Sequence, residues 1–258
     1  MSLFASTADF YGRYRSGITA EVAELLSASA PAGAPRRLLD VGTGTGLVIR
    51  ALLPHFDEAI GVDPDPDLLA VGRDQLRGAR QVRLLPGRAE DFALDPGWRA
   101  QLVTVCRAFH WFDRPAFLSH VRGAMAPRAT LAILGDRSIW DGGDEWKDRA
   151  RRVVQDMLGQ ERRAGEGTYR PSARSFVDDL TDAGYTGASS HFLPVERNRT
   201  VEEVIGLLHS MSFASPAVLG DAIGEFDRRI RDELTPLASD GALTDHNEYY
   251  VYTATRPR

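Results

Sequence analysis

Short apolar segments alternate with segments of helical periodicity, and this alternation limits the possible folds more than any other feature of the sequence. Strands are expected at 36–42, 58–63, 81–87, 101–106 and 130–135. Helices are expected at 18–28, 47–56, 66–78 and 114–125. Because strands joined through helices form right-handed parallel crossovers, the sequence predicts an α/β fold with a mostly parallel sheet and helices on both faces.

The second half of the chain is more polar and less regular. Helices are predicted near 146–158, at 172–183, and twice between 200 and 235. Strands near 188–196 and at 247–255 would complete a seven-stranded sheet. No linker separates two domains, so we expect a single domain over 1–258. In this domain, 136–170 and 200–235 are expected to form a helical lid over the carboxyl-terminal edge of the sheet.

Composition excludes several classes of protein. The net charge is −5 with no basic run, which argues against nucleic acid as a partner. No apolar stretch approaches the ~20 residues of a membrane span. No signal peptide is recognisable, and Cys106 is the only cysteine, so we expect a cytoplasmic protein without disulfides. The DPDPD stretch at 63–67 lacks the Gly and Glu of a calcium loop, and no metal site is expected.

The segment LLDVGTGTG, at 38–46, places three glycines between a predicted strand and a predicted helix. Gly42, Gly44 and Gly46 allow a sharp turn and the close approach of a ligand to the backbone. A dinucleotide-binding turn would need its third glycine at Leu47, and a Walker loop would need a lysine. Neither pattern requires the acid at Asp40, which could accept hydrogen bonds from loop N–H groups or from an ammonium group.

LLDVGTGTG, followed by GVDPDPDLL at 61–69, resembles the class I S-adenosylmethionine-dependent methyltransferases. FYGRYR at 10–15, AFHWFD at 108–113 and LLHSMSF at 207–213 are similar to its small-molecule branch, which contains trans-aconitate-methyltransferase-like proteins. The resemblance implies a Rossmann-like fold, S-adenosyl-L-methionine as cofactor and a small-molecule substrate. The composition is typical of a bacterial protein, and we expect a role in secondary metabolism.

The resemblance also implies roles for individual residues. Asp63 would bind the ribose hydroxyls, Glu90 or Asp91 would approach the adenine, and Arg15 would lie near the cofactor carboxylate. The expected cofactor-binding residues are Tyr14, Arg15, Asp40, Gly42, Thr43, Gly44, Gly46, Asp63, Pro64, Glu90, Asp91, Arg107 and Ala108. The expected substrate pocket comprises Tyr11, His110, Trp111, Trp140 and His209.

Three positions depart from the family pattern. Gln101 stands where the fourth strand usually begins with Asp, and PRA at 127–129 replaces the usual PGG turn. Arg107 occupies a position that is commonly a small or amide residue. The first two departures hardly touch the cofactor assignment. The charge of Arg107 could instead reflect an anionic substrate or a changed chemistry.

His110 is the candidate catalytic residue. A hydroxyl or protonated amine acceptor needs a general base, which is a common role of histidine, whereas a carboxylate acceptor needs only to be oriented. A passive place in the pocket wall and simple packing are the alternatives for His110. A second class of function also stays open, in which the fold binds the cofactor but catalyses a cyclisation or hydrolysis, or acts as a binding subunit. A nicotinamide oxidoreductase is disfavoured by Leu47.

Overall fold

The computed structural model describes residues 7–161, 163–164, 167–168 and 174–256. Part of the predicted lid, and the first two residues of the helix predicted at 172–183, lie outside the described residues. The chain divides into two compact units. Unit 1 comprises residues 1–15, 136–170 and 194–248, and unit 2 comprises residues 16–135, 171–193 and 249–258. Both segments predicted as lid therefore belong to unit 1.

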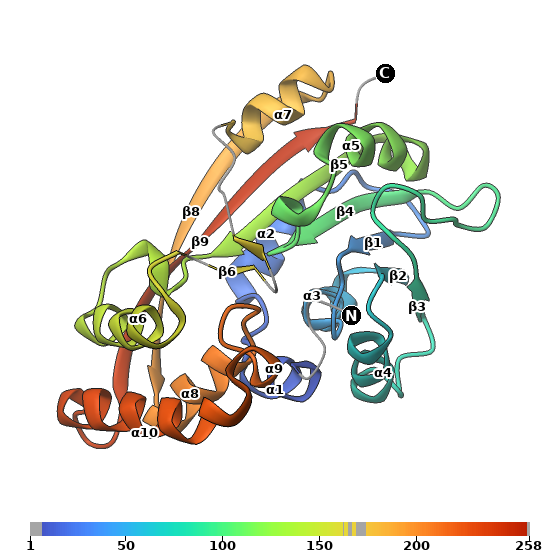
Figure 1. Cartoon of the computed structure of the whole chain (residues 1–258). Coiled ribbons are helices and arrows are strands. Elements are labelled where there is room, and N and C mark those ends of the chain that lie inside the picture. The colour runs from blue at the N-terminus through green and yellow to red at the C-terminus, as the bar shows by residue number, and fades with distance from the viewer. Residues whose placement is uncertain (1–6, 162, 165–166, 169–173, 257–258) are drawn as a thin grey trace. The chain divides into compact units, whose positions relative to one another are not determined.

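A seven-stranded sheet has the order β3-β2-β1-β4-β5-β9-β8 (Figure 1). Its strands are β1 (Arg37–Val41), β2 (Glu58–Asp63), β3 (Val82–Pro86), β4 (Ala100–Cys106), β5 (Met125–Asp136), β8 (Thr186–Arg199) and β9 (Leu243–Thr255). The pairs β1–β2, β2–β3, β1–β4 and β4–β5 are parallel. β8 and β9 run from one unit into the other. The predicted α/β fold with a mostly parallel sheet is confirmed.

The central strands are buried on both faces, which explains why they are almost continuously apolar. One face contributes alternate residues to a single apolar cluster with helices of unit 2: Leu39, Val41, Val103, Val105, Leu131 and Ile133, with Phe117 and Leu180. Their neighbours Leu38, Leu102 and Leu134 point to the opposite face and are equally buried. A charged side chain without a partner would therefore be costly on either face of these strands.

Two helices of unit 2, α4 (Pro66–Gln75) and α5 (Arg114–Val121), begin at the caps that the sequence indicates. The others are α2 (Ala20–Ser29), α3 (Leu47–Leu52) and α7 (Phe176–Asp182), with the short 3₁₀ turns η1 (Leu53–His55), η2 (Phe109–Trp111) and η3 (Arg122–Ala124). Asp65 and Asp113 cap α4 and α5 through backbone N–H groups, as predicted. The helices predicted at 47–56 and 114–125 both end early and continue as 3₁₀ turns, the first of which contains Pro54.

β5 begins five residues before the predicted strand at 130–135. Its pairing with β4 shifts register between Ala100 and Leu102, which marks a bulge. Arg128 has φ 62°, a conformation that favours glycine. The replacement of the usual glycine turn by PRA at 127–129 therefore leaves the turn in place, with an arginine in a left-handed conformation.

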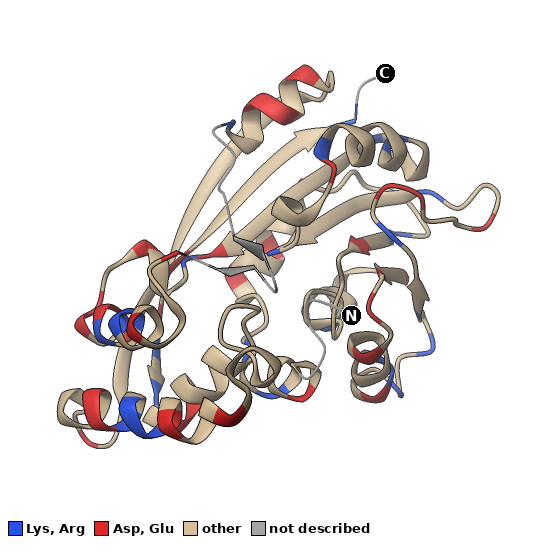
Figure 2. Cartoon of the chain, in the orientation of Figure 1, with Lys and Arg blue, Asp and Glu red and all other residues tan. Residues whose placement is uncertain are grey.

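Unit 1 is built from amphipathic helices. They are α1 (Ala8–Tyr14), α6 (Glu145–Leu158), α8 (Val201–His209), α9 (Pro216–Leu219) and α10 (Ile223–Leu234), with η4 (Ile139–Asp141), η5 (Gly220–Ala222), η6 (Thr235–Leu237) and the short strands β6 (Arg163–Ala164) and β7 (Gly167–Thr168). On α10, Phe226, Ile230 and Leu234 recur every four residues and are fully buried. Its other faces carry charges of both signs (Figure 2). Across the described ranges, no helix is both long and apolar enough to cross a membrane.

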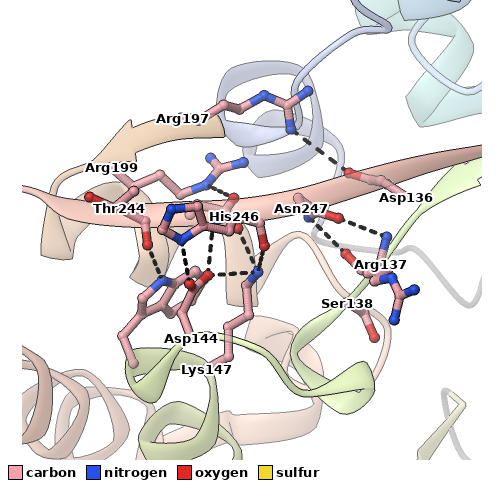
Figure 3. A network of polar contacts seen from close by, with 12 residues as sticks. Asp136, Arg137, Ser138, Asp144, Lys147, Arg197, Arg199, Thr244, His246 and Asn247 are labelled. Carbon is pink, nitrogen blue, oxygen red and sulfur yellow. Dashed lines mark hydrogen bonds and ion pairs between the residues drawn. The ribbon is translucent and has the colours of Figure 1, made fainter. Parts of the chain in front are cut away.

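A buried ionic network joins α6 to β9 and β8 within unit 1 (Figure 3). Lys147, the only lysine in the sequence, is 2% exposed. Its Nζ lies 2.8 Å from Asp245 Oδ1 and 3.0 Å from Asp144 Oδ2. Arg199 pairs with the other oxygen of Asp245 at 2.8 Å, and His246 pairs with Asp144 at 2.7 Å. Each buried charge thus has a partner of opposite sign, which offsets the cost of removing it from water.

Lys147→Met is expected to destabilise the protein by about 3–5 kcal/mol, because it leaves buried carboxylates with too little positive charge. Urea unfolding followed by circular dichroism measures this change. Arg228→Met is the matched control, since it removes an arginine whose pairs with Glu225 and Asp232 are exposed and screened by water. A small effect in both variants would contradict a structural role for the network.

Candidate functional site at the glycine turn

The turn after β1 has the backbone that its glycines permit. Gly42, Gly44 and Gly46 have φ values of 73°, 55° and 78°, which L side chains rarely adopt. The N–H groups of Gly42 and Thr43 both donate to the carbonyl of Val62, at 2.8 and 3.1 Å. The turn is therefore attached to the end of β2.

The turn also touches the loop that follows β4. A Cβ on Gly42 would lie 2.5 Å from the Cβ of Ala108 and 3.4 Å from the ring of Phe112. No side chain fits in that space. β1 and β4 are parallel neighbours, so their carboxyl ends reach the same edge of the sheet, where open α/β sheets bind ligands.

Asp63 joins two loops through its carboxylate. One oxygen accepts the N–H of Gly44 at 2.8 Å, and the other accepts the N–H of Asp65 at 2.9 Å. The residue is 7% exposed, and this burial raises its pKa, against the lowering effect of the two N–H donors. A carboxylate has about four acceptor sites, so Asp63 keeps capacity for two further donors such as vicinal hydroxyls.

Asp40 is more deeply buried, at 1% exposure. Burial raises its pKa to about 6, although the hydroxyl of Thr104 donates to Oδ1 at 2.7 Å and favours the ionised form. The side chain of Thr43 is near enough to act in the same direction, without a hydrogen bond of good geometry. Asp40 is therefore a carboxylate whose negative charge is only partly compensated by the protein.

Three buried oxygen atoms around the turn make no hydrogen bond within the described structure: Asp40 Oδ2, Thr43 Oγ1 and Thr45 Oγ1. Buried polar atoms in proteins are normally satisfied, so this concentration of exceptions indicates a place for a polar ligand. Two buried carboxylates beside the turn favour hydroxyl donors or a positive charge, and disfavour a phosphate. S-adenosylmethionine, with its ammonium, sulfonium and ribose hydroxyls, fits this set of donors and acceptors.

The acidic pair after β3 separates into two environments. Glu90 accepts the N–H of Asp113 at 3.0 Å and lies 3.4 Å from Arg88, so it connects this loop to the start of α5. Asp91 and Pro64 are exposed. Their predicted contacts with the cofactor stay predictions.

The segment RAFHWFD, at 107–113, divides its residues among different roles. Phe109 is 2% exposed and packs edge-on against Phe117 and Phe176, so it belongs to the core. His110 and Trp111 are partly exposed, with ring centroids 4.8 Å apart. His110 therefore occupies the loop after β4, on the same loop as Ala108, which contacts the glycine turn.

The other predicted site residues belong to unit 1, where α1 packs along α8. A Cβ on Gly206 would lie 2.4 Å from the ring of Tyr14, and Arg15 Nε donates to Ser210 Oγ at 2.9 Å. Both ring nitrogens of His209 are engaged, by Asp227 at 2.8 Å and by the Ala214 carbonyl at 3.1 Å.

His209 is buried by these contacts, which match a core histidine. The ring of Tyr11 stacks with the guanidinium of Arg15 at 5.0 Å, and Trp140 packs on Phe213 at 5.4 Å. The proposed cofactor and substrate contacts of this group stay predictions.

Sequence reasoning named Thr43 but missed Thr45 and Thr104. Thr104 is the one hydroxyl in the apolar segment QLVTVC and pairs in register with Asp40 across the two strands. A polar residue within a buried strand was the available signal. Thr45 carried no separate signal, because the pattern of the turn is defined by its glycines.

Comparison with known proteins agrees with this geometry. Residues 39–131 match the model of the methyltransferase domain. An uncharacterised methyltransferase of Mycobacterium tuberculosis is 34% identical over 146 residues, which is 56% of this chain and 55% of that protein. Trans-aconitate 2-methyltransferase of Methylobacterium nodulans is 28% identical over 68% of this chain and 67% of its own. A candidate type II methyltransferase structure from Anaeromyxobacter dehalogenans superposes with a TM-score of 0.62, at 20% identity, over 95% of this chain and all of that one.

In this region the chain is similar to the class I S-adenosylmethionine-dependent methyltransferases. The resemblance found in LLDVGTGTG and GVDPDPDLL is thereby confirmed. The chain spans about half the length of the mycobacterial relative, 55%.

Asp40→Asn is expected to stabilise the protein at neutral pH. An acid whose pKa rises from 3.8 to about 6 binds more protons in the folded protein than in the unfolded chain between those values. The free energy of unfolding therefore falls as the pH rises through that window, and above it the cost is about 3 kcal/mol.

Urea unfolding at several pH values measures the difference between wild type and Asp40→Asn. The variant should gain most at pH 7 and lose its advantage near pH 4, with exposed Asp74→Asn as control. A difference that does not change with pH would contradict the assignment.

Proposed function

We propose that the protein transfers a methyl group from S-adenosyl-L-methionine to a small-molecule acceptor. The observation that carries the proposal is the pair of buried carboxylates, Asp40 and Asp63, on either side of a left-handed glycine turn with unpartnered buried oxygens. Methyltransferase relatives, including one named for a small organic acid, support the same class of reaction. When bound, the cofactor supplies an electrophilic methyl group on a sulfonium centre.

The residues of unit 2 would divide the binding between them. Asp63 would accept the ribose hydroxyls with the capacity that Gly44 and Asp65 leave free. Asp40 Oδ2 would accept a hydrogen bond from a cationic group, which would lower the pKa of Asp40 and recover part of its burial cost. Gly44 has no side chain, so a ligand could approach the backbone of the turn at this residue.

His110 is proposed to act on the acceptor. Its loop follows β4 at the ligand-binding edge of the sheet and is partly exposed. With a hydroxyl or protonated amine acceptor, the imidazole would remove the proton as the methyl group is transferred, a contribution of roughly 10²–10⁴-fold. With a carboxylate acceptor no base is needed, and His110 would orient the anion.

Asp63→Ala is expected to weaken binding of S-adenosylmethionine by about 1.5–3 kcal/mol, because it removes the acceptor for the ribose hydroxyls. Isothermal titration calorimetry measures this affinity. Asp67→Ala is the matched control, since Asp67 lies in the same DPDPD stretch but is exposed. Unchanged affinity in Asp63→Ala would rule out the assignment of Asp63.

His110→Ala is expected to lower turnover by at least roughly tenfold with an acceptor that must lose a proton, while cofactor affinity stays the same. Transfer of labelled methyl from the cofactor to a panel of alcohols, amines and carboxylic acids tests this. Firm cofactor binding without transfer across a broad panel would favour the non-methylating function instead. Equal turnover of variant and wild type would leave His110 as part of the pocket wall.

A further inference from the structure

Arg107 has an unusual backbone conformation for its residue type. Its φ is 56°, in the left-handed region, where residues other than glycine, asparagine and aspartate have a high conformational energy. Such a conformation persists only where surrounding contacts hold it, and strained residues of this kind are concentrated at functional sites. Arg107 is the first residue after β4 and precedes Ala108, which contacts the glycine turn.

The guanidinium of Arg107 holds two parts of unit 2 that are distant in sequence. Nη1 donates to the carbonyl of Ser16 at 3.2 Å, and Nη2 donates to the hydroxyl of Tyr249 at 3.1 Å. The Tyr249 hydroxyl in turn donates to the carbonyl of Gly17 at 2.9 Å. Arg107 and the fully buried Tyr249 thus fix two successive carbonyls of one segment.

That segment lies against the helix that follows the glycine turn. A Cβ on Gly17 would be 3.6 Å from the carbonyl oxygen of Leu47, the first residue of α3. The turn is therefore flanked at both ends. Ala108 borders it at Gly42, and Gly17 borders it just after Gly46. Arg107 precedes Ala108 in the chain and is linked to Gly17 by hydrogen bonds through the Tyr249 hydroxyl.

We propose that Arg107 is a positioning residue for the glycine turn at 42–46. It holds Ser16 directly, and Gly17 through Tyr249, against the start of α3, and we call this arrangement the clamp. The proposal rests on the proposed function, because the turn is taken to bind S-adenosylmethionine. This role differs from the predicted direct contact of Arg107 with the cofactor, and it rests on the two guanidinium N–H groups that donate to Ser16 and Tyr249. The planar, two-sided guanidinium suits this task, and a lysine could not reach both acceptors in the same way.

The arrangement also explains why a strained backbone is kept. A left-handed residue at 107 turns the chain sharply at the end of β4, so that one residue bonds the 16–17 segment and the next packs on Gly42. Glycine at 107 would adopt this backbone without strain but would have no guanidinium. Arg107→Gly therefore separates the clamp from the backbone conformation.

The test compares Arg107→Gly, Tyr249→Phe and the double variant with wild type. Calorimetry with S-adenosylmethionine should show binding weakened about tenfold in each single variant, the loss of roughly one good hydrogen bond. The double variant should lose little more than either single variant, because both remove the same clamp. Millimolar guanidinium should restore part of the affinity of Arg107→Gly, and methylammonium should not, which a merely structural loss would not produce.

Hydrogen exchange without cofactor separates this inference from the proposed function. Amides at 16–18 and 42–47 should exchange faster in both single variants than in wild type. If wild type fails to bind S-adenosylmethionine, the proposed function is wrong, and the exchange data still decide whether the clamp exists. Unchanged exchange in both variants, or cofactor affinity that stays within about twofold of wild type, overturns the proposal.

Discussion

The carboxylate of Asp63 is the interaction on which the candidate site depends. It is buried at the end of β2 and accepts N–H groups from the glycine turn and from the start of α4. Because those donors come from two loops, one side chain keeps the ends of β1 and β2 in a common arrangement. The buried charge is costly by itself, and the N–H donors offset only part of that cost. A ligand with hydroxyl donors would offset more, which couples binding to the stability of the turn.

Asp40 follows the same principle more strongly. Its pKa of about 6 means that the folded protein carries an energetic cost at neutral pH that a cationic ligand can relieve. Stability is thus lowered at the candidate site, a pattern typical of functional sites. Thr104 limits the cost with one hydrogen bond, yet leaves Oδ2 for a ligand.

The two units satisfy their charges and apolar groups in different ways. Unit 2 buries both faces of its parallel strands and keeps its few buried carboxylates at the strand ends. Unit 1 packs amphipathic helices around their own apolar cluster and adds the ionic network of Lys147, Asp144, Asp245 and Arg199. The network has a full set of opposite charges, unlike the carboxylates at the glycine turn. Each of these four side chains thus lies beside an opposite charge, and the charge of the network is compensated within unit 1.

The sequence by itself determined the α/β fold, the order of nearly all its elements, the glycine turn and the acids beside it, because these follow from local periodicity and backbone chemistry. Asp65 and Asp113 were identified as caps for the same reason. The sequence could not reveal that Tyr249 meets Arg107 across 142 residues, that Phe109 is core while His110 is partly exposed, or that His209 is engaged by Asp227. Such contacts depend on how distant segments pack, so only the tertiary structure decided them. Arg107 illustrates the difference: its charge alone suggested an anion, and only the structure reveals that two of its N–H groups donate to Ser16 and Tyr249 of its own chain.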